Sequence, residues 1–112
     1  MKLVSAVIQP FMLDEVRDAL RKLGCHGMTV TDVQGFGMQK AQQEVYRGAN
    51  YNPEYVAKSK IEILIHEQFQ EQVVSAIVEA ARTGNVGDGK IWVTNVEEAV
   101  RVRTGERGDA AL

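Results

Sequence analysis

The spacing of hydrophobic residues alternates between two periods along the chain. Residues 3–8 form a short apolar run rich in β-branched side chains, which predicts a buried strand ending before Pro10. Residues 13–23 place leucine and valine at steps of three and four with charged residues between them. This spacing predicts an amphipathic helix, which Gly24 ends. Residues 28–33 are predicted to be a second strand.

The second half of the chain repeats this order. Residues 58–66 alternate strictly, with isoleucine on one face and Lys60, Glu62 and Leu64 on the other, which predicts a strand. A helical stripe covers residues 73–81, and a glycine-rich turn then leads into a strand at 91–94. Alternation over 99–103 predicts a short extra strand, and a loose tail is expected beyond it.

The order of elements predicts an α+β fold in one domain, residues 1–112. Two βαβ halves joined by a long loop are typical of the ferredoxin-like (split βαβ) sandwich, an antiparallel sheet with two helices on one face. Because apolar residues occupy both registers of the strands, the second face needs a cover, and identical subunits are the simplest one. The polar stretch 35–57 far exceeds the usual loop of about 4–6 residues. It is either an unrecognised element or a functional loop.

Composition narrows the classes of function. The chain has 112 residues and a formal charge of -2, which excludes a general attraction to nucleic acid or anionic membrane. Any anion site must therefore come from local placement of cations and backbone N–H groups. A single cysteine excludes an internal disulfide, and no apolar run approaches the ~18 residues of a membrane span. We expect a cytoplasmic protein.

The turn at 84–90 nearly matches the phosphate-loop pattern G-x-x-x-x-G-K-[ST]. Gly84, Gly89 and Lys90 are in register, but Ile91 replaces the hydroxyl that would bind Mg²⁺. The turn also runs from helix to strand, the reverse of a phosphate loop, which argues against a nucleotidase. Glycine N–H groups and a lysine still favour an anion site. The alternative is a plain connection with a solvated lysine.

Two further groups of charged residues could bind an anionic ligand. Arg101 and Arg103 are two residues apart on the predicted extra strand, so they should share a face, unless they only protect an edge strand. Lys58, Lys60 and Glu62 share the polar face of their strand, which could equally be the solvated side of the sheet. No catalytic constellation or metal-ligand spacing surrounds either histidine.

Six sequence blocks carry a resemblance to a known family. They are VIQPF at 7–11, GMTVT at 27–31, GFGMQK at 35–40, YRGANY at 46–51, TGNVGDGKIWV at 83–93 and RVRTGE at 101–106. In this order they resemble the PII nitrogen-regulatory signal-transduction proteins, over essentially the whole chain. The block at 83–93 is the most specific of the six.

The resemblance implies a signalling protein and not an enzyme. PII proteins are homotrimers of ferredoxin-like subunits with ATP or ADP in the clefts between neighbours. The resemblance implies a T-loop at about 37–55, a glycine-rich B-loop at 82–90 and a C-terminal loop at 102–112. It also implies a T-loop partner such as an ammonium transporter or a nitrogen-metabolism enzyme, with no nucleic-acid partner and no insertion into a membrane.

Site residues follow from the same resemblance. The B-loop would hold the phosphates, the two arginines would come from the adjacent subunit, and Glu62 and Leu64 would line the adenine end beside Gly35 and Gly37. 2-Oxoglutarate is a candidate second ligand, bound through Gln39 and Lys58, and Gln39 would also ligate Mg²⁺ beside ATP. Tyr51 falls where many members are uridylylated or adenylylated. The implied nucleotide contacts are Gly35, Gly37, Met38, Gln39, Glu62, Leu64, Gly87, Asp88, Gly89, Lys90, Arg101 and Arg103.

Several positions depart from the family pattern, which predicts a divergent member. The family usually has arginine at 38, glycine at 41, a basic residue at 9, an acidic residue at 50 and often lysine at 85. A lost hydrogen bond to a charged group costs about 1.5–3 kcal/mol, so we expect weakened binding of ATP with 2-oxoglutarate. The alternative ligands are then ADP, AMP or another metabolite such as bicarbonate. The alternative functions are a small nucleotidase and a purely structural trimer. The residues present are Gln9, Met38, Ala41, Asn50 and Asn85; Asn50 also weakens the case for modification of Tyr51.

Overall fold

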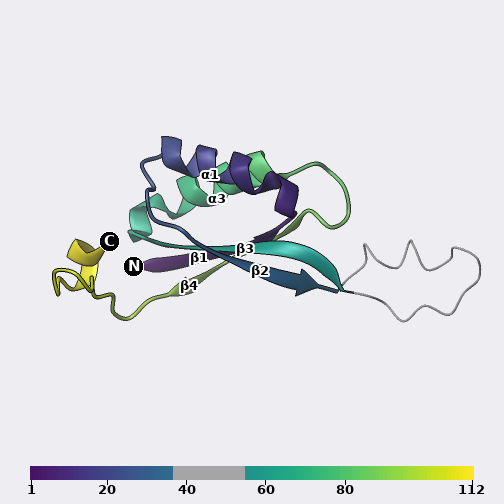
Figure 1. Ribbon diagram of the computed structural model, residues 1–112. Helices are drawn as coiled ribbons and strands as arrows, with labels where there is room; N and C mark the ends of the chain where they lie inside the picture. Colours follow the sequence, from purple (N-terminus) through teal and green to yellow (C-terminus); the bar gives the residue numbers. More distant parts are fainter. Residues whose placement is uncertain (37–54) are drawn as a thin grey trace, which may run out of the picture.

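The fold is built on a four-stranded antiparallel sheet, seen in a computed structural model that describes residues 1–36 and 55–112. The strands lie in the order β2-β3-β1-β4, so the two central strands come from different halves of the chain (Figure 1). Each neighbouring pair is antiparallel. The bounds are β1 Lys2–Ile8, β2 Thr29–Gly35, β3 Val56–Ile65 and β4 Gly89–Asn95.

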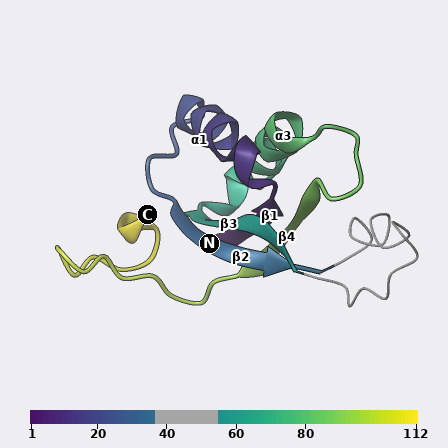
Figure 2. The same ribbon diagram turned by 45° about the vertical axis from the view of Figure 1, so that its right-hand side comes forward.

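Two helices cover one face of this sheet. Helix α1 (Leu13–Lys22) follows the 3-10 turn η1 (Pro10–Met12), and α3 (Gln70–Ala81) follows η3 (Glu67–Phe69). Both helices lie on the same side of the sheet in Figures 1 and 2. The predicted ferredoxin-like sandwich is therefore confirmed, and the helices begin and end within a few residues of the predicted bounds.

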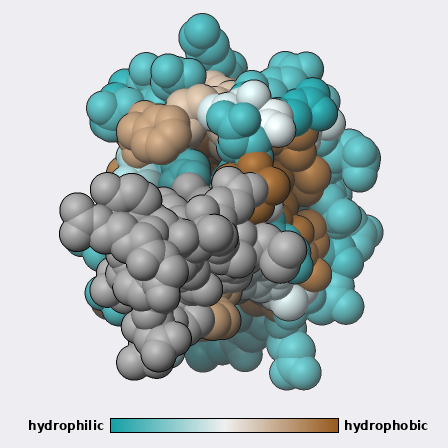
Figure 3. All heavy atoms as spheres, turned by 90° about the vertical axis from the view of Figure 1, so that its right-hand side faces the viewer, coloured by the Kyte–Doolittle hydropathy of each residue, from teal (hydrophilic) through white to brown (hydrophobic). Residues whose placement is uncertain are grey.

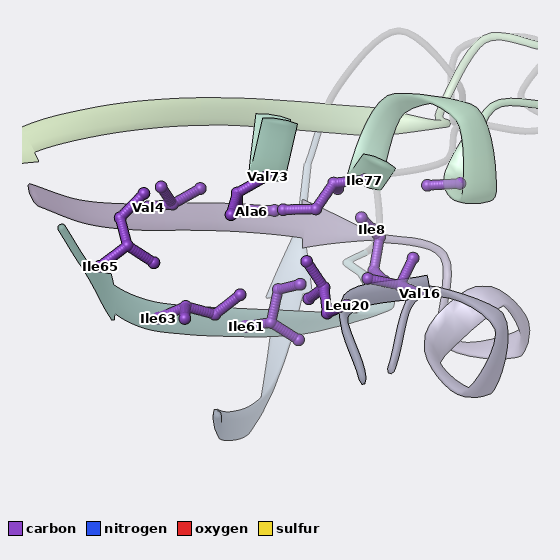
Figure 4. Packing of buried hydrophobic residues seen from close by; sticks show 11 residues of the cluster. Val4, Ala6, Ile8, Val16, Leu20, Ile61, Ile63, Ile65, Val73 and Ile77 are labelled. Atoms are coloured by element: carbon purple, nitrogen blue, oxygen red, sulfur yellow. The ribbon is translucent and has the colours of Figure 1, made fainter. Parts of the chain in front are cut away.

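The core lies between the helices and the two central strands (Figure 4). β1 and β3 pair with Val4 opposite Ile63, so their buried side chains share one face. Fully burying one such side chain stabilises the fold by about 1.5–3 kcal/mol. The predicted isoleucine face of β3 is confirmed. The buried hydrophobic residues are Val4, Ala6, Ile8, Val16, Leu20, Ile61, Ile63, Ile65, Val73, Ile77 and Ala81.

The opposite face of the sheet combines apolar and charged side chains. Leu64 and Trp92 are 45% and 40% exposed, and the ammonium of Lys60 lies 5.8 Å from the Trp92 ring centroid. The same ammonium lies 4.0 Å from the Glu62 carboxylate. The sequence predicted apolar side chains on this second face of the sheet, and Leu64 and Trp92 are exposed there.

The outer surface of the helix layer is polar. In the view onto the right-hand end of Figure 1, hydrophilic side chains dominate the top, over the helices (Figure 3). Arg17 of α1, for example, forms ion pairs with Asp14 at 3.2 Å and Asp18 at 3.4 Å. No helix within residues 1–36 and 55–112 is long and apolar enough to cross a membrane.

The C-terminal segment differs from the sequence prediction in two ways. Instead of a strand over 99–103, the chain makes a tight reversal with a single bridge between Val100 and Arg107. Gly105, at φ +73, reverses the chain and donates its N–H to the Arg101 carbonyl at 2.7 Å. The tail is also not loose, because it ends in the 3-10 turn η4 (Gly108–Ala111). The predicted strand over 99–103 is therefore wrong, because the alternating valines and arginines lie in a chain reversal.

Candidate functional site

The glycine-rich turn between α3 and β4 is closed by one carboxylate. Asp88 accepts hydrogen bonds from the Thr83 backbone N–H at 2.8 Å, the Thr83 hydroxyl at 2.5 Å and the Gly84 N–H at 2.9 Å. These bonds, the Thr83 hydroxyl first, hold the pKa of Asp88 below its ordinary value of 3.8. The turn thus has a defined shape before any ligand arrives.

Glycine is required where the turn meets β1. Gly89 has φ +121, a conformation that other residues rarely adopt, and a Cβ there would lie 1.9 Å from the Val7 carbonyl oxygen. Gly87 has φ +100. The backbone therefore passes β1 at a distance that only glycine allows, with its N–H groups uncovered by side chains of their own.

Lys58 lies against this turn from the sheet side. Its side chain is buried, with 8% of the residue exposed, and its ammonium donates to the Gly87 carbonyl at 2.6 Å. Burial lowers the pKa of Lys58, and the charge of Asp88 partly opposes that shift. Gly35 is next to it, since a Cβ at Gly35 would lie 3.3 Å from Lys58 Cγ. The structure therefore brings together a first group, which we call the turn group: Gly35, Lys58 and residues 87–90.

Other predicted residues gather at the far end of the sheet. Glu62, Leu64 and Arg101 line a cleft of about 1160 Å³, together with residues of the connection from α1 to β2, the start of α3 and the C-terminal segment. Sequence reasoning did not select the other lining residues, because neither their type nor their spacing points to a ligand. We call this set the cleft group; besides those three residues it includes Met28, Thr29, His66, Phe69 and Leu112.

Arg101 is held in this cleft by the chain's own C-terminal segment. Its guanidinium lies 3.3 Å from the Glu106 carboxylate and donates to the Leu112 carbonyl at 3.0 Å. Arg103 is exposed and falls in the turn at 102–104. The prediction that both arginines share one strand face is therefore wrong, because the chain reverses where a strand was expected.

The turn group and the cleft group lie at opposite ends of the sheet. Gly89 pairs with Ile8 at one end of β1, and Asn95 pairs with Lys2 at the other. At about 3.3 Å per residue, Leu64 of the cleft group lies about 20 Å along β3 from Lys58 of the turn group, and Glu62 lies about 13 Å from it. Gly35 is likewise separated from Glu62, because it pairs with Val56 at the other end of β3. Within one chain the expected ligand residues are therefore spread along the length of the sheet.

Several predicted residues lie outside the described part of the chain. These are Gly37, Met38, Gln39 and Tyr51. Within residues 1–36 and 55–112 no cluster of three or more His, Cys, Asp or Glu side chains could hold a metal ion. The magnesium prediction rests on Gln39 alone.

Comparison with known proteins gives close relatives over the full length. The family described as Nitrogen regulatory protein P-II matches residues 1–106. The P-II protein of Bradyrhizobium diazoefficiens is 53% identical over 112 residues, and P-II 1 of Escherichia coli K12 is 49% identical; each match covers 100% of both chains. A crystal structure of Arabidopsis thaliana PII bound to citrate matches with a TM-score of 0.83 at 41% identity, covering 99% of this chain and 91% of that one.

These similarities confirm the resemblance that the sequence blocks carried. They also confirm the prediction of a regulatory protein and not an enzyme, since the relatives are named as nitrogen regulators. The expected divergence is overstated, because about half of all positions are identical in relatives of the same length.

Proposed function

Because the chain belongs to the nitrogen regulatory protein P-II family of signalling proteins, we propose that it senses adenine nucleotides at a site formed between identical subunits. The observation that carries this proposal is the division of the expected ligand residues into two groups at opposite ends of one sheet. A head-to-tail ring of three chains would bring the turn group of each subunit to the cleft group of its neighbour.

The two groups have complementary chemistry for ATP or ADP. The turn group supplies the N–H groups of Gly87 and Gly89 and the cation of Lys90, which suit phosphate oxygens. The cleft group supplies an apolar wall at Leu64 for the adenine and a carboxylate at Glu62 that can accept hydrogen bonds from an amine or a hydroxyl. Arg101 lines the same cleft and can bind a phosphate through its planar fork of donors.

A second ligand site is proposed at Lys58, with Gln39 as its partner. A dicarboxylate such as 2-oxoglutarate would pair with the buried ammonium of Lys58, which now donates to the Gly87 carbonyl at 2.6 Å. The related Arabidopsis protein binds citrate, another carboxylate anion, in its crystal structure. Mg²⁺, if bound, would be held by Gln39 and would supply positive charge that offsets the charge of the anionic ligands. Since Gln9 and Met38 lack the charge expected there, binding of ATP with 2-oxoglutarate should be weaker than in a member with both cations.

The regulated target is proposed to bind the segment between β2 and β3. We propose a partner in nitrogen regulation, such as an ammonium transporter or a nitrogen-metabolism enzyme, acting with this protein in the cytoplasm. Tyr51 is the proposed site of nucleotidyl modification. Intact mass of the protein isolated from nitrogen-starved and nitrogen-replete cells tests this, and a Tyr51→Phe variant must abolish any mass shift.

Subunit complementation tests the shared site directly. Lys90→Ala removes a turn-group cation and Arg101→Ala a cleft-group cation, so each variant alone should bind ATP at least about tenfold more weakly in calorimetry. Refolded together, every mixed trimer contains one site with both cations, so about a quarter of the wild-type sites should recover full affinity. A site within one chain would give no recovery.

Calorimetry with ATP, ADP and AMP, each with and without 2-oxoglutarate, then settles the ligand. Strong synergy between ATP and 2-oxoglutarate at low micromolar concentration would contradict the weakened binding that Gln9 and Met38 predict. Failure of every adenine nucleotide to bind or to raise the melting temperature would overturn the proposed sensor. Bicarbonate, titrated in parallel, tests the alternative metabolite.

A further inference from the structure

Asp88 belongs to the predicted nucleotide contacts, yet its polar atoms are engaged inside the turn. One carboxylate oxygen accepts from the Thr83 and Gly84 backbone N–H groups, and the other accepts from the Thr83 hydroxyl. The Asp88 N–H donates to the Asn85 carbonyl at 3.3 Å. A residue whose carboxylate and N–H both have partners in its own turn has little left to offer a ligand.

The charge of Asp88 has the wrong sign for a phosphate contact. A carboxylate within a few ångströms of a polyphosphate repels it, and more strongly where water is partly excluded. The surrounding turn is held by Asp88 with its negative charge facing the donors of Thr83 and Gly84. Those donors lie N-terminal to Gly87 and Gly89, so the charge is turned toward the end of α3.

The turn is also fixed from its other side. Lys58 donates to the Gly87 carbonyl at 2.6 Å, and the Asn85 N–H donates to the Thr83 hydroxyl oxygen at 3.3 Å. Gly87 therefore lies between two anchored neighbours, Lys58 across the sheet and Asp88 next in the chain. Both anchors hold the peptide between Gly87 and Asp88, whose carbonyl accepts from Lys58 and whose N–H donates to Asn85.

We propose that Asp88 and Thr83 are positioning residues, which aim the N–H groups of Gly87 and Gly89 at the phosphates without either side chain touching the ligand. This inference rests on the proposed function and assigns Asp88 a different role from the direct contact that the family resemblance implies. The hydroxyl of Thr83 matters because it is both donor to Asp88 and acceptor from Asn85.

Four variants, one control variant and two ligands test the assignment. Asp88→Asn and Thr83→Val each remove part of the Thr83–Asp88 pair, and each should lower ATP affinity about tenfold in calorimetry at neutral pH. Thr83→Ser keeps the hydroxyl and should bind within about twofold of wild type. The double variant Asp88→Asn/Thr83→Val should be no worse than either single variant, since both act through one contact.

Adenosine separates positioning from a general loss of structure. Because adenosine has no phosphates, its binding to the cleft should be unchanged in all variants, as measured by chemical-shift titration. Asp14→Asn, on the exposed face of α1, is the matched carboxylate control and should leave both affinities unchanged. Equal losses for ATP and adenosine would overturn the positioning role.

The sign of the Asp88→Asn effect distinguishes the two roles. A direct neighbour of the phosphates would repel them, so removing its charge would tighten ATP binding; unchanged or tighter binding therefore overturns the inference and leaves the proposed function standing. If the wild-type protein binds no adenine nucleotide, the proposed function fails, and the inference fails with it.

Discussion

Gly89 offers the sharpest test of how the turn is joined to the sheet. Replacing it by alanine adds one methyl group at a backbone φ of +121, where an L-residue is strained by about 1–2 kcal/mol. The new Cβ would lie 1.9 Å from the Val7 carbonyl oxygen and 2.9 Å from its carbon, both backbone atoms of β1. Separating the strands at such an overpacked contact costs about a further 1–3 kcal/mol. We therefore expect Gly89→Ala to lower the free energy of unfolding by about 2–5 kcal/mol.

Gly84 is the matched control for that substitution. It has φ +91 in the same turn, but a Cβ there would meet no heavy atom within 4 Å. Gly84→Ala should therefore show only the conformational strain of about 1–2 kcal/mol. Urea unfolding, with all proteins at one protomer concentration because assembly contributes to apparent stability, measures the difference. Equal destabilisation by the two substitutions would refute the close approach to Val7.

Three further predictions follow from burial and charge. Ile61→Ala, in the fully buried centre of β3, should cost about 2–5 kcal/mol in urea unfolding, whereas Val102→Ala at a 97% exposed position should stay within about 0.5 kcal/mol. Because hydrogen bonds lower the pKa of Asp88, its carboxylate contributes to the stability of the folded state above pH 3.8, and this contribution is lost as the pH falls through the lowered pKa. The melting temperature of Asp88→Asn should therefore fall less steeply in acid than that of the wild type. Burial lowers the pKa of Lys58, so between the lowered pKa and pH 10.5 the unfolded chain binds more protons than the folded one. The stability of the wild type should therefore rise as the pH rises toward 10.5. Melting curves at alkaline pH should show this rise for the wild type and not for Lys58→Met.

The layers of the fold could be predicted because hydrophobic spacing reports them directly. The isoleucines of β3 recur at every second residue, and all three lie against the helices. The apolar stripe of α1 likewise buries Val16 and Leu20. Such periods depend only on which face is covered, so one sequence suffices to recognise them.

Contacts set by chain reversals could not be predicted in this way. Val100, Arg101, Val102 and Arg103 alternate as a strand would, but Gly105 reverses the chain and leaves Val102 almost fully exposed. Lys58 shows the same limit, since its alternation with Lys60 and Glu62 suggested a solvated side chain. It is buried, and its ammonium donates to the carbonyl of Gly87, a contact between positions 29 residues apart.

The position of the turn group bears on how a bound ligand could be read out. The segment expected to select the partner lies between Phe36, which follows β2, and Tyr55, which precedes β3. The ring centroids of Phe36 and Tyr55 lie 6.0 Å apart. Lys58 is three residues beyond Tyr55 and already contacts Gly87. Under the proposed function, an anion that draws the Lys58 ammonium away from the Gly87 carbonyl changes two contacts at once. It alters the strand next to the partner-binding segment, and it releases the glycine-rich turn. A ligand there therefore needs no long path to alter the partner-binding segment, because a single buried side chain belongs to both.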